Sequence, residues 1–245
     1  MKKTLSLLAV LMAAGVAATP AQAAKHYVSG FGGISWMNNL NTSEVYQAVS
    51  GNHSRDFDLG SGLALTGAIG CDYGNYRFEA EVGYQTNDVK SATHYIDGIA
   101  QSEPTNASGS TTTTTPAWRG DVSALTLMGN GYYDFDLGSK VELYATAGVG
   151  VAQVSFHDVN NVTDVSSSAP YTFTANPDPG LNGHETTLAW QVGAGIAAPI
   201  ADNVKLDLRY RYFATTDFTL TGVNDGSINT NLSSHSVLLG LRVDF

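Results

Sequence analysis

Residues 204–213 read VKLDLRYRYF, in which charged side chains alternate with bulky apolar ones. Successive side chains of an extended strand point to opposite faces, so Lys205, Asp207, Arg209 and Arg211 would share one face. At about 3.3 Å per residue and a tilt of about 40°, the stretch rises about 25 Å, the height of the apolar band of an outer-membrane barrel. It is therefore long enough to cross a bilayer as a strand, with lipid on its apolar side.

Composition alone does not distinguish such a barrel from a soluble β domain. The chain has 245 residues, of which 43% are hydrophobic and 14% charged, and it contains 26 glycines. Its single cysteine, Cys71, excludes an intramolecular disulfide and any metal site built from several cysteines. We expect Cys71 to be a small apolar strand residue, and the fold has to be read from the alternation.

The N-terminus predicts export. A lysine pair at residues 2–3 precedes the apolar run 5–16, and Ala-Gln-Ala at 21–23 matches the small-x-small cleavage pattern of a secretory signal. The apolar run is shorter than the roughly 20 residues that a transmembrane helix needs. We therefore predict a signal peptide over residues 1–23 and a single outer-membrane barrel domain over residues 24–245.

Cleavage of this signal should leave Ala24 as the first residue of the mature chain, because the small-x-small pattern ends at Ala23. Mass spectrometry of the protein taken from outer-membrane fractions measures that terminus directly. An intact Met1 in the same fraction would contradict the prediction.

The alternation recurs along the chain and predicts an all-β fold, an eight-stranded antiparallel up-and-down transmembrane β-barrel. In the third strand, Arg77, Glu79 and Glu81 would face inward. The two faces of the first strand are too alike to assign, and the sixth strand should stop before Pro199. The eight predicted strands span residues 26–37, 63–72, 76–85, 122–134, 141–155, 187–198, 204–213 and 235–245.

The connections between these strands alternate in length. Those around Gly74, Gly138 and Asp202 are short, which is typical of periplasmic turns, whereas the others have the length of extracellular loops. Exposed loops on a rigid barrel are the part expected to carry function. The long connections span residues 38–62, 86–121, 156–186 and 214–234.

Charge is distributed unevenly between lumen and loops. The long connections hold thirteen acids and only three bases, while the inward faces are nearly balanced. An eight-stranded barrel is only wide enough for its own side chains, and buried charges need partners. The predicted lumen charge network consists of Arg77, Glu79, Glu81, Glu142, Lys205, Asp207, Arg209, Arg211 and Arg242, and Asp72, Asp134 and Asp244 would also face inward. Glycines 148, 150, 193 and 195 would leave some space in the lumen.

Six sequence stretches in order carry a resemblance to a known family. They are YVSGFGGISW (27–36), NYRFEAEVGY (75–84), NGYYDF (130–135), YATAGVGVA (144–152), LDLRYRYF (206–213) and SVLLGLRVDF (236–245). The chain resembles the eight-stranded outer-membrane barrels of the OmpA-like and opacity-protein type, which include porin-like surface antigens of Gram-negative bacteria.

This resemblance implies a location in the outer membrane, in contact with its lipid and lipopolysaccharide. It also implies that Phe245 is the terminal signal for the outer-membrane assembly machinery, and that Glu79 or Glu81 pairs across the lumen with Arg209 or Arg211. The function it implies is structural and surface-interacting, of the adhesin or surface-antigen type, with an extracellular partner bound through the loops.

Two other functions are alternatives: a narrow passive channel for ions or small solutes, and a lipid-modifying enzyme. Some barrels of this kind use His and Ser at the outer rim, and Ser233 and His235 share a face here. The lipid A deacylases carry His-x-Ser in that order, whereas residue 237 is Val. We therefore predict no catalytic site. We also expect no metal site, because the acidic loops lack the spacing of a calcium loop. No cofactor and no nucleic-acid partner are expected either.

Overall fold

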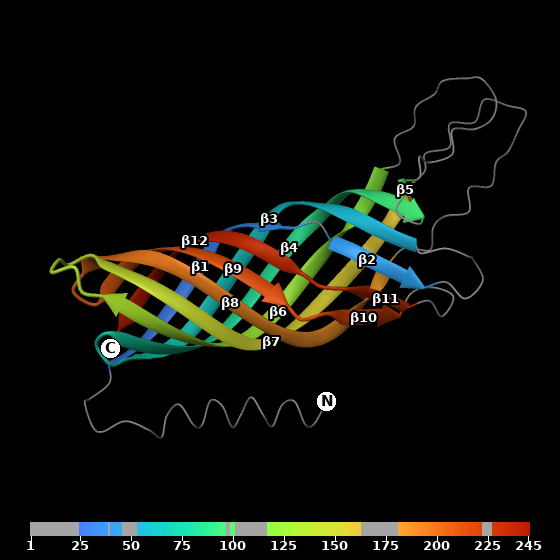
Figure 1. Cartoon of the computed structure of the whole chain (residues 1–245). Coiled ribbons are helices and arrows are strands. Elements are labelled where there is room, and N and C mark those ends of the chain that lie inside the picture. Colours follow the sequence, from blue (N-terminus) through green and yellow to red (C-terminus); the bar gives the residue numbers. More distant parts are fainter. Residues whose placement is uncertain are drawn as a thin grey trace, which may run out of the picture.

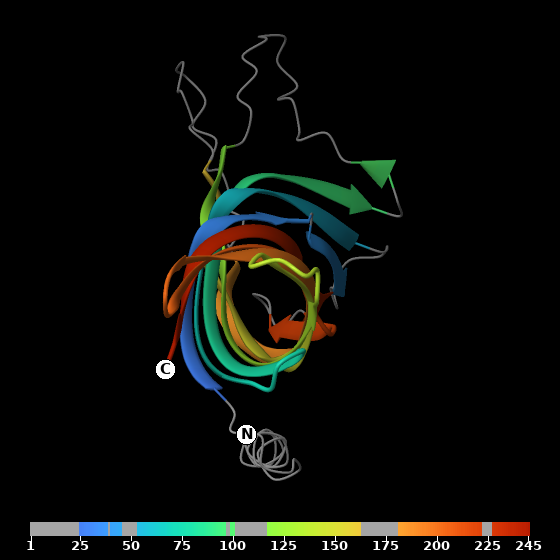
Figure 2. The ribbon, with the colours of Figure 1, turned by 90° about the vertical axis from the view of Figure 1, so that its left-hand side faces the viewer.

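The structure, a computed structural model, describes residues 25–38, 40–45, 53–96, 99–100, 117–162, 181–221 and 227–245. Eight long strands form one closed antiparallel ring, as predicted (Figures 1 and 2). They are β1 (Lys25–Met37), β3 (His53–Asp72), β4 (Tyr76–Ile96), β6 (Ala117–Phe135), β7 (Glu142–Val162), β8 (Leu181–Ala201), β9 (Val204–Thr215) and β12 (Ser233–Asp244). Each pairs with the next, and β12 pairs back with β1, so the ring has no unpaired edge within the membrane-spanning part.

The outward side chains of the eight strands form an apolar band bordered by aromatic rings. Near the short turns, the ring centroids of Tyr76 and Tyr133 lie 5.3 Å apart. At the opposite border, those of Trp190 and Tyr212 lie 5.5 Å apart, and Trp36, Tyr84 and Tyr210 face out as well. Two aromatic belts around an apolar band are typical of a barrel whose outer face meets lipid.

Leu208 lies in the middle of this band on β9 and is 47% exposed. Replacing it with arginine should reduce the free energy of unfolding by about 2 to 4 kcal/mol, because a charge would face lipid near the bilayer midplane. Urea titration in lipid vesicles measures the loss. As a control, Thr186→Arg, which is exposed beyond the band on β8, should cost less than about 1 kcal/mol. A harmless Leu208→Arg would mean that the lipid-facing and lumen-facing sides are exchanged.

The closed ring settles the orientation of the first strand. Tyr27 and Phe31 of β1 point into the lumen and are almost fully buried, whereas Val28 and Ile34 face outward. The neighbouring strands make room for both rings, because a Cβ at Gly70 of β3 would collide with the Tyr27 ring and one at Gly240 of β12 with Phe31. The rings of Tyr27 and Phe31 thus occupy the space that a side chain at Gly70 or Gly240 would take.

Five strands continue far beyond the apolar band, so the prediction of four long loops is wrong in part. Residues 53–60, 86–96 and 117–121 are strand, as are 156–162 and 181–186. Beyond the band the two faces of each strand exchange character. On β4 the exposed residues become Asp88 and Lys90 with Val89 buried between them, and on β7 Val154 and Phe156 point inward.

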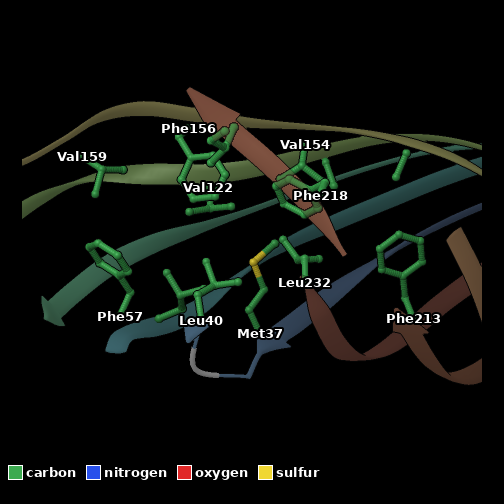
Figure 3. Close-up of a cluster of buried hydrophobic side chains, with 14 of the residues drawn as sticks. Met37, Leu40, Phe57, Val122, Val154, Phe156, Val159, Phe213, Phe218 and Leu232 are labelled. Carbon is green, nitrogen blue, oxygen red and sulfur yellow. The ribbon is translucent and has the colours of Figure 1, made fainter. Parts of the chain in front are cut away.

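We call the part of the barrel beyond the outer aromatic belt the head. It contains the extended ends of β3, β4, β6, β7 and β8 and four short strands: β2 (Leu40–Val45), β5 (Ile99–Ala100), β10 (Phe218–Thr221) and β11 (Ser227–Thr230). An apolar cluster fills its interior (Figure 3). The cluster includes Leu40, Phe57, Val122, Val154, Phe156, Val159, Phe218 and Leu232. The head is therefore built like a soluble β domain, apolar inside and polar outside.

The short turns follow the prediction, with one local correction at Pro199. Asp72 pairs with the inward-facing Arg77, and its Oδ1 accepts a hydrogen bond from the Gly74 backbone N–H at 2.7 Å, which stabilises a turn in which Gly74 has φ 93°. The sixth strand does not stop before Pro199. It runs to Ala201, and Pro199 pairs with Lys205 directly before a register shift, where a missing backbone N–H is tolerated.

In the part of the chain that the structure describes, no helix combines the length and the apolar character required to span a membrane.

Candidate functional site

The lumen is crossed by charged side chains, beginning at the periplasmic end with Arg77. This fully buried residue donates two hydrogen bonds to Asp134, from Nε to Oδ2 at 2.6 Å and from Nη2 to Oδ1 at 2.8 Å. Its guanidinium lies 4.5 Å from the ring centroid of Tyr132 and 4.9 Å from that of Tyr144. A bidentate ion pair and two aromatic faces therefore set the position of Arg77 together.

Four further charged residues meet at the same end, from strands β7, β9 and β12. Glu142 accepts hydrogen bonds from Lys205 Nζ and from Arg242 Nη2. Asp244 lies 3.7 Å from Lys205 Nζ and 3.7 Å from Arg242 Nε. Two acids and two bases thus neutralise one another where the lumen meets the periplasm.

Arg209 occupies the middle of the lumen. Its Nη1 lies 3.3 Å from Glu81 Oε2 and its Nη2 lies 4.0 Å from Glu79 Oε1. The guanidinium carbon lies 4.0 Å from the ring centroid of Phe31, and Nε donates to the Tyr144 hydroxyl at 3.1 Å. Strands β4, β7, β9 and β1 therefore meet at this one side chain.

Tyrosine hydroxyls donate hydrogen bonds to the remaining central acids. The Tyr132 hydroxyl donates to Glu79, and the Tyr144 hydroxyl donates to Asp207 Oδ1 at 2.6 Å. All four residues are buried. Because a buried carboxylate is costly unless it is paired and hydrogen-bonded, these contacts are what allow the acids to remain in the lumen.

The upper part of the lumen is polar but less charged. Glu81 lies 3.6 Å from Arg211 Nη1 and accepts a hydrogen bond from Gln191 Nε2 at 3.2 Å. Arg211 also donates to Gln85 Oε1 at 3.3 Å, and Gln85 in turn contacts Ser234. The apolar cluster of the head (Figure 3) reaches down to this layer through Ala124 and Met128, which pair with Gln85 and Glu81.

The glycines that were expected to leave space in the lumen are covered instead. A Cβ at Gly195 would collide with the Tyr144 hydroxyl, one at Gly148 with Asn130, and one at Gly150 with the backbone of Leu127. Side-chain or backbone atoms of the neighbouring strand therefore occupy the space that these glycines leave, which is how close packing is reached in a narrow barrel.

All nine residues of the predicted lumen charge network lie on inward faces, on β4, β7, β9 and β12. The structure brings eight of them together in two groups, one around Glu142 and one around Arg209, whereas Arg77 pairs with Asp134. The alternation also predicts inward positions for Gln85, Asn130 and Gln191, which are buried as expected. It does not predict that they are hydrogen-bond partners of the charged residues, nor does it predict the head. The head could have been found from the reversed alternation in DVSA (121–124) and VSFH (154–157).

The rim residues considered for catalysis make separate contacts. Ser233 Oγ accepts a hydrogen bond from Asn38 Nδ2 at 2.8 Å, whereas His235 Nδ1 lies 2.7 Å from the Tyr210 hydroxyl within the outer aromatic belt. Cys71 lies on the outer face, with its Sγ 3.3 Å from His26 Nδ1. Among the described residues, no three His, Cys, Asp or Glu side chains are grouped so as to hold a metal ion.

The last residue is tied to the first strand. The backbone N–H of Phe245 donates to the carbonyl of His26 at 2.8 Å, and the Phe245 ring is 73% exposed on the outer face. The role of Phe245 as an assembly signal stays a prediction.

Comparison with known proteins agrees with this architecture. The sequence profile of the outer membrane protein beta-barrel domain matches residues 6–245. The outer membrane protein PagN of Salmonella typhimurium is 27% identical over 195 residues, covering 76% of this chain and 72% of PagN. A protein of Rickettsia conorii named as a candidate adhesin, RC1281, is 25% identical over 225 residues, covering 85% and 82%.

Among solved structures, the outer membrane protein OprG from Pseudomonas aeruginosa superposes with a TM-score of 0.50 at 13% identity, covering 91% of this chain and 96% of OprG. At that identity the likeness concerns the fold. Because the profile match extends over nearly the whole chain, the protein resides in the outer membrane and belongs to the outer membrane protein beta-barrel domain family.

Proposed function

We propose that this barrel is a surface-interaction protein of the adhesin type, whose head binds an extracellular partner while the membrane part holds the head in place. The observation that carries the proposal is the head itself. Five strands continue beyond the lipid-facing band around a buried apolar cluster, which is a rigid support for residues that face outward. A protein that only had to span the membrane would need none of this.

The relatives support the same function. One of them is named as a candidate adhesin and the other, PagN, as an outer membrane protein. Both align with most of this chain, so the similarity includes the strands that form the head. We take the adhesin-type role from these names and from the architecture together.

The structure suggests a clean way to remove most of the head, namely the extended ends of β4, β6 and β7, β5 and the first residues of β8. Asp88 of β4 pairs with Asp121 of β6, and Ser155 of β7 pairs with His184 of β8. Joining each pair through an Asn-Gly turn deletes residues 89–120 and 156–183 and leaves a hairpin at the border of the apolar band. Bacteria that carry this variant should lose adhesion to host-cell monolayers, measured against bacteria with the parent protein.

The variant must still be a barrel for this test to count. Retained heat-modifiable migration in electrophoresis and an unchanged amount in outer-membrane fractions establish that. Undiminished adhesion by this truncated barrel would contradict the proposed function.

We also propose that the barrel is neither an open channel nor an enzyme. The lumen contains Arg77 and Arg209, each fixed by acids and rings, so a passive path for ions would be narrow and rarely open. Ser233 and His235 each contact a different neighbour. Mass spectrometry of lipid A from cells with and without the protein tests the enzyme alternative, and no change that depends on His235 is expected.

Contacts with outer-membrane lipid and lipopolysaccharide, and with the assembly machinery through Phe245, belong to the same proposal. The exposed apolar band and the exposed ring of Phe245 support them. No cofactor enters the proposal.

A further inference from the structure

The head is not a closed ring like the membrane part. The ladder between β4 and β6 ends at Asp88 and Asp121, and the ladder between β8 and β9 ends at Ala189 and Thr215. Beyond these points the described strands form two sheets, β6-β7-β8 and β10-β11-β2-β3-β4-β5. The apolar cluster lies between the two sheets, with members from both (Figure 3).

This division leaves one side of the outer end of β8 without a ladder partner among the described strands. The backbone N–H of Thr216 donates to the carbonyl of Leu188, so Leu188 directs its backbone groups toward β9. Backbone groups of alternate residues point to the same side of a strand. Those of Asn182, His184 and Thr186 therefore point to the side from which β9 has departed.

The same residues are open to solvent. Asn182, Gly183, His184 and Thr186 are all exposed, and a Cβ at Gly183 would meet no atom within 4 Å. On the side of β8 from which β9 has departed, β10 pairs with β11 and not with β8. Its Phe218 and Leu220 are buried in the apolar cluster. A sheet edge with free N–H and C=O groups is a template for one more strand.

We propose that the edge formed by residues 182–186 of β8 binds an extended, basic polypeptide segment of an extracellular partner by strand addition. This inference rests on the proposed surface-interaction function and names the partner's chemistry. The backbone of the edge would supply affinity, and the charge of the head would select the partner.

Charge decides between the possible occupants. In the head, the described side chains that carry charge are Asp56, Asp58, Asp88, Asp121, Asp158, Glu185 and Asp217 against Lys90. The long connections as a whole hold thirteen acids and three bases. A second copy of this chain would bring the same negative charge to the edge, and like charges repel. A segment rich in lysine or arginine is attracted instead.

The test uses refolded full-length protein in detergent and a fluorescein-labelled decapeptide that alternates lysine and threonine, read by fluorescence anisotropy. Two further peptides are controls. One has glutamate in place of lysine, and the other is N-methylated at the alternate backbone nitrogens that would face β8. The lysine peptide should bind. The glutamate peptide should not bind, and N-methylation should weaken binding at least about tenfold because it removes the donors that strand addition needs.

The matched protein variants are His184→Pro and His184→Ala. Proline removes the edge N–H, which no described ladder uses, and is compatible with an edge strand, so His184→Pro should weaken binding at least about tenfold. His184→Ala keeps the N–H and should bind within about twofold of the parent. Heat-modifiable migration shows whether each variant is folded.

Three results would overturn the inference: no binding of the lysine peptide, equal binding of the N-methylated peptide, or a concentration-dependent dimer of the parent that His184→Pro abolishes. The last result would assign the edge to a second copy. Bacteria with His184→Pro that adhere like the parent would overturn this inference while the adhesin-type function stands. If the protein binds the peptide through this edge but confers no adhesion, the adhesin-type function is overturned and the strand-addition inference stands.

Discussion

Arg209→Ala should convert a nearly closed barrel into one that conducts more often or with larger steps. The parent guanidinium lies against Phe31 and pairs with Glu81 and Glu79 in the middle of the lumen. Truncation removes the side chain that fills the middle of the lumen. It also leaves the buried acids Glu79 and Glu81 with one base fewer. Planar-bilayer recordings of refolded protein should show small, rare events for the parent and larger or more frequent ones for the variant.

The same substitution should reduce the free energy of unfolding by about 3 to 5 kcal/mol, the cost of removing one partner from a buried ion pair. The double variant Arg209→Ala with Glu81→Gln should recover part of this loss, because it removes the acid that Arg209 compensated. Lys90→Ala, an exposed cation of the head, is the control and should alter neither property.

Steady conductance of the parent on the scale of a sixteen-stranded porin, whose lumen is an aqueous channel, would contradict the packed lumen. Transport would then replace surface interaction as the function that the structure favours.

Phe156→Ala should destabilise the head by about 3 to 5 kcal/mol, the usual cost of truncating a buried phenylalanine. Phe156 is 3% exposed and lies in the apolar cluster with Val154 and Phe218 (Figure 3). The membrane part is held mainly by its ion pairs and its closed ladder of strands, so its stability should change much less. Proteinase K added to barrels in vesicles should digest the head of the variant faster and leave a protected membrane fragment.

Ser155→Ala, on the opposite face of the same strand, is the matched control and should leave the digestion rate unchanged. If Phe156→Ala is digested no faster than the parent, the apolar side chains of the head do not hold its two sheets together. The edge proposed for strand addition would then lack a rigid support.

Several features of this protein follow from local alternation. Residues 204–213 and 76–85 show which side chains face lipid and which face the lumen, because the period of two is a property of every extended chain. The position of the short turns and the inward direction of Arg209 and Glu81 follow in the same way. So does the excess of acids in the long connections.

Other features depend on contacts between distant segments. Arg209 and Glu81 meet across the lumen at a sequence separation of 128 residues, and the first strand has its orientation because Gly70 and Gly240 leave room for Tyr27 and Phe31. Alternation gives the faces of one strand but neither the register nor the identity of its neighbours.

The head shows the same division most clearly. Reversed alternation is present in residues 154–157, but a short stretch of this kind is equally compatible with a loop. It becomes a strand because Val154 and Phe156 bury their side chains against Val122 of β6 and Phe218 of β10. Local pattern therefore determined which residues could face lipid, while only the packing of remote strands decided where the lipid-facing barrel ends and where the edge of β8 is left open.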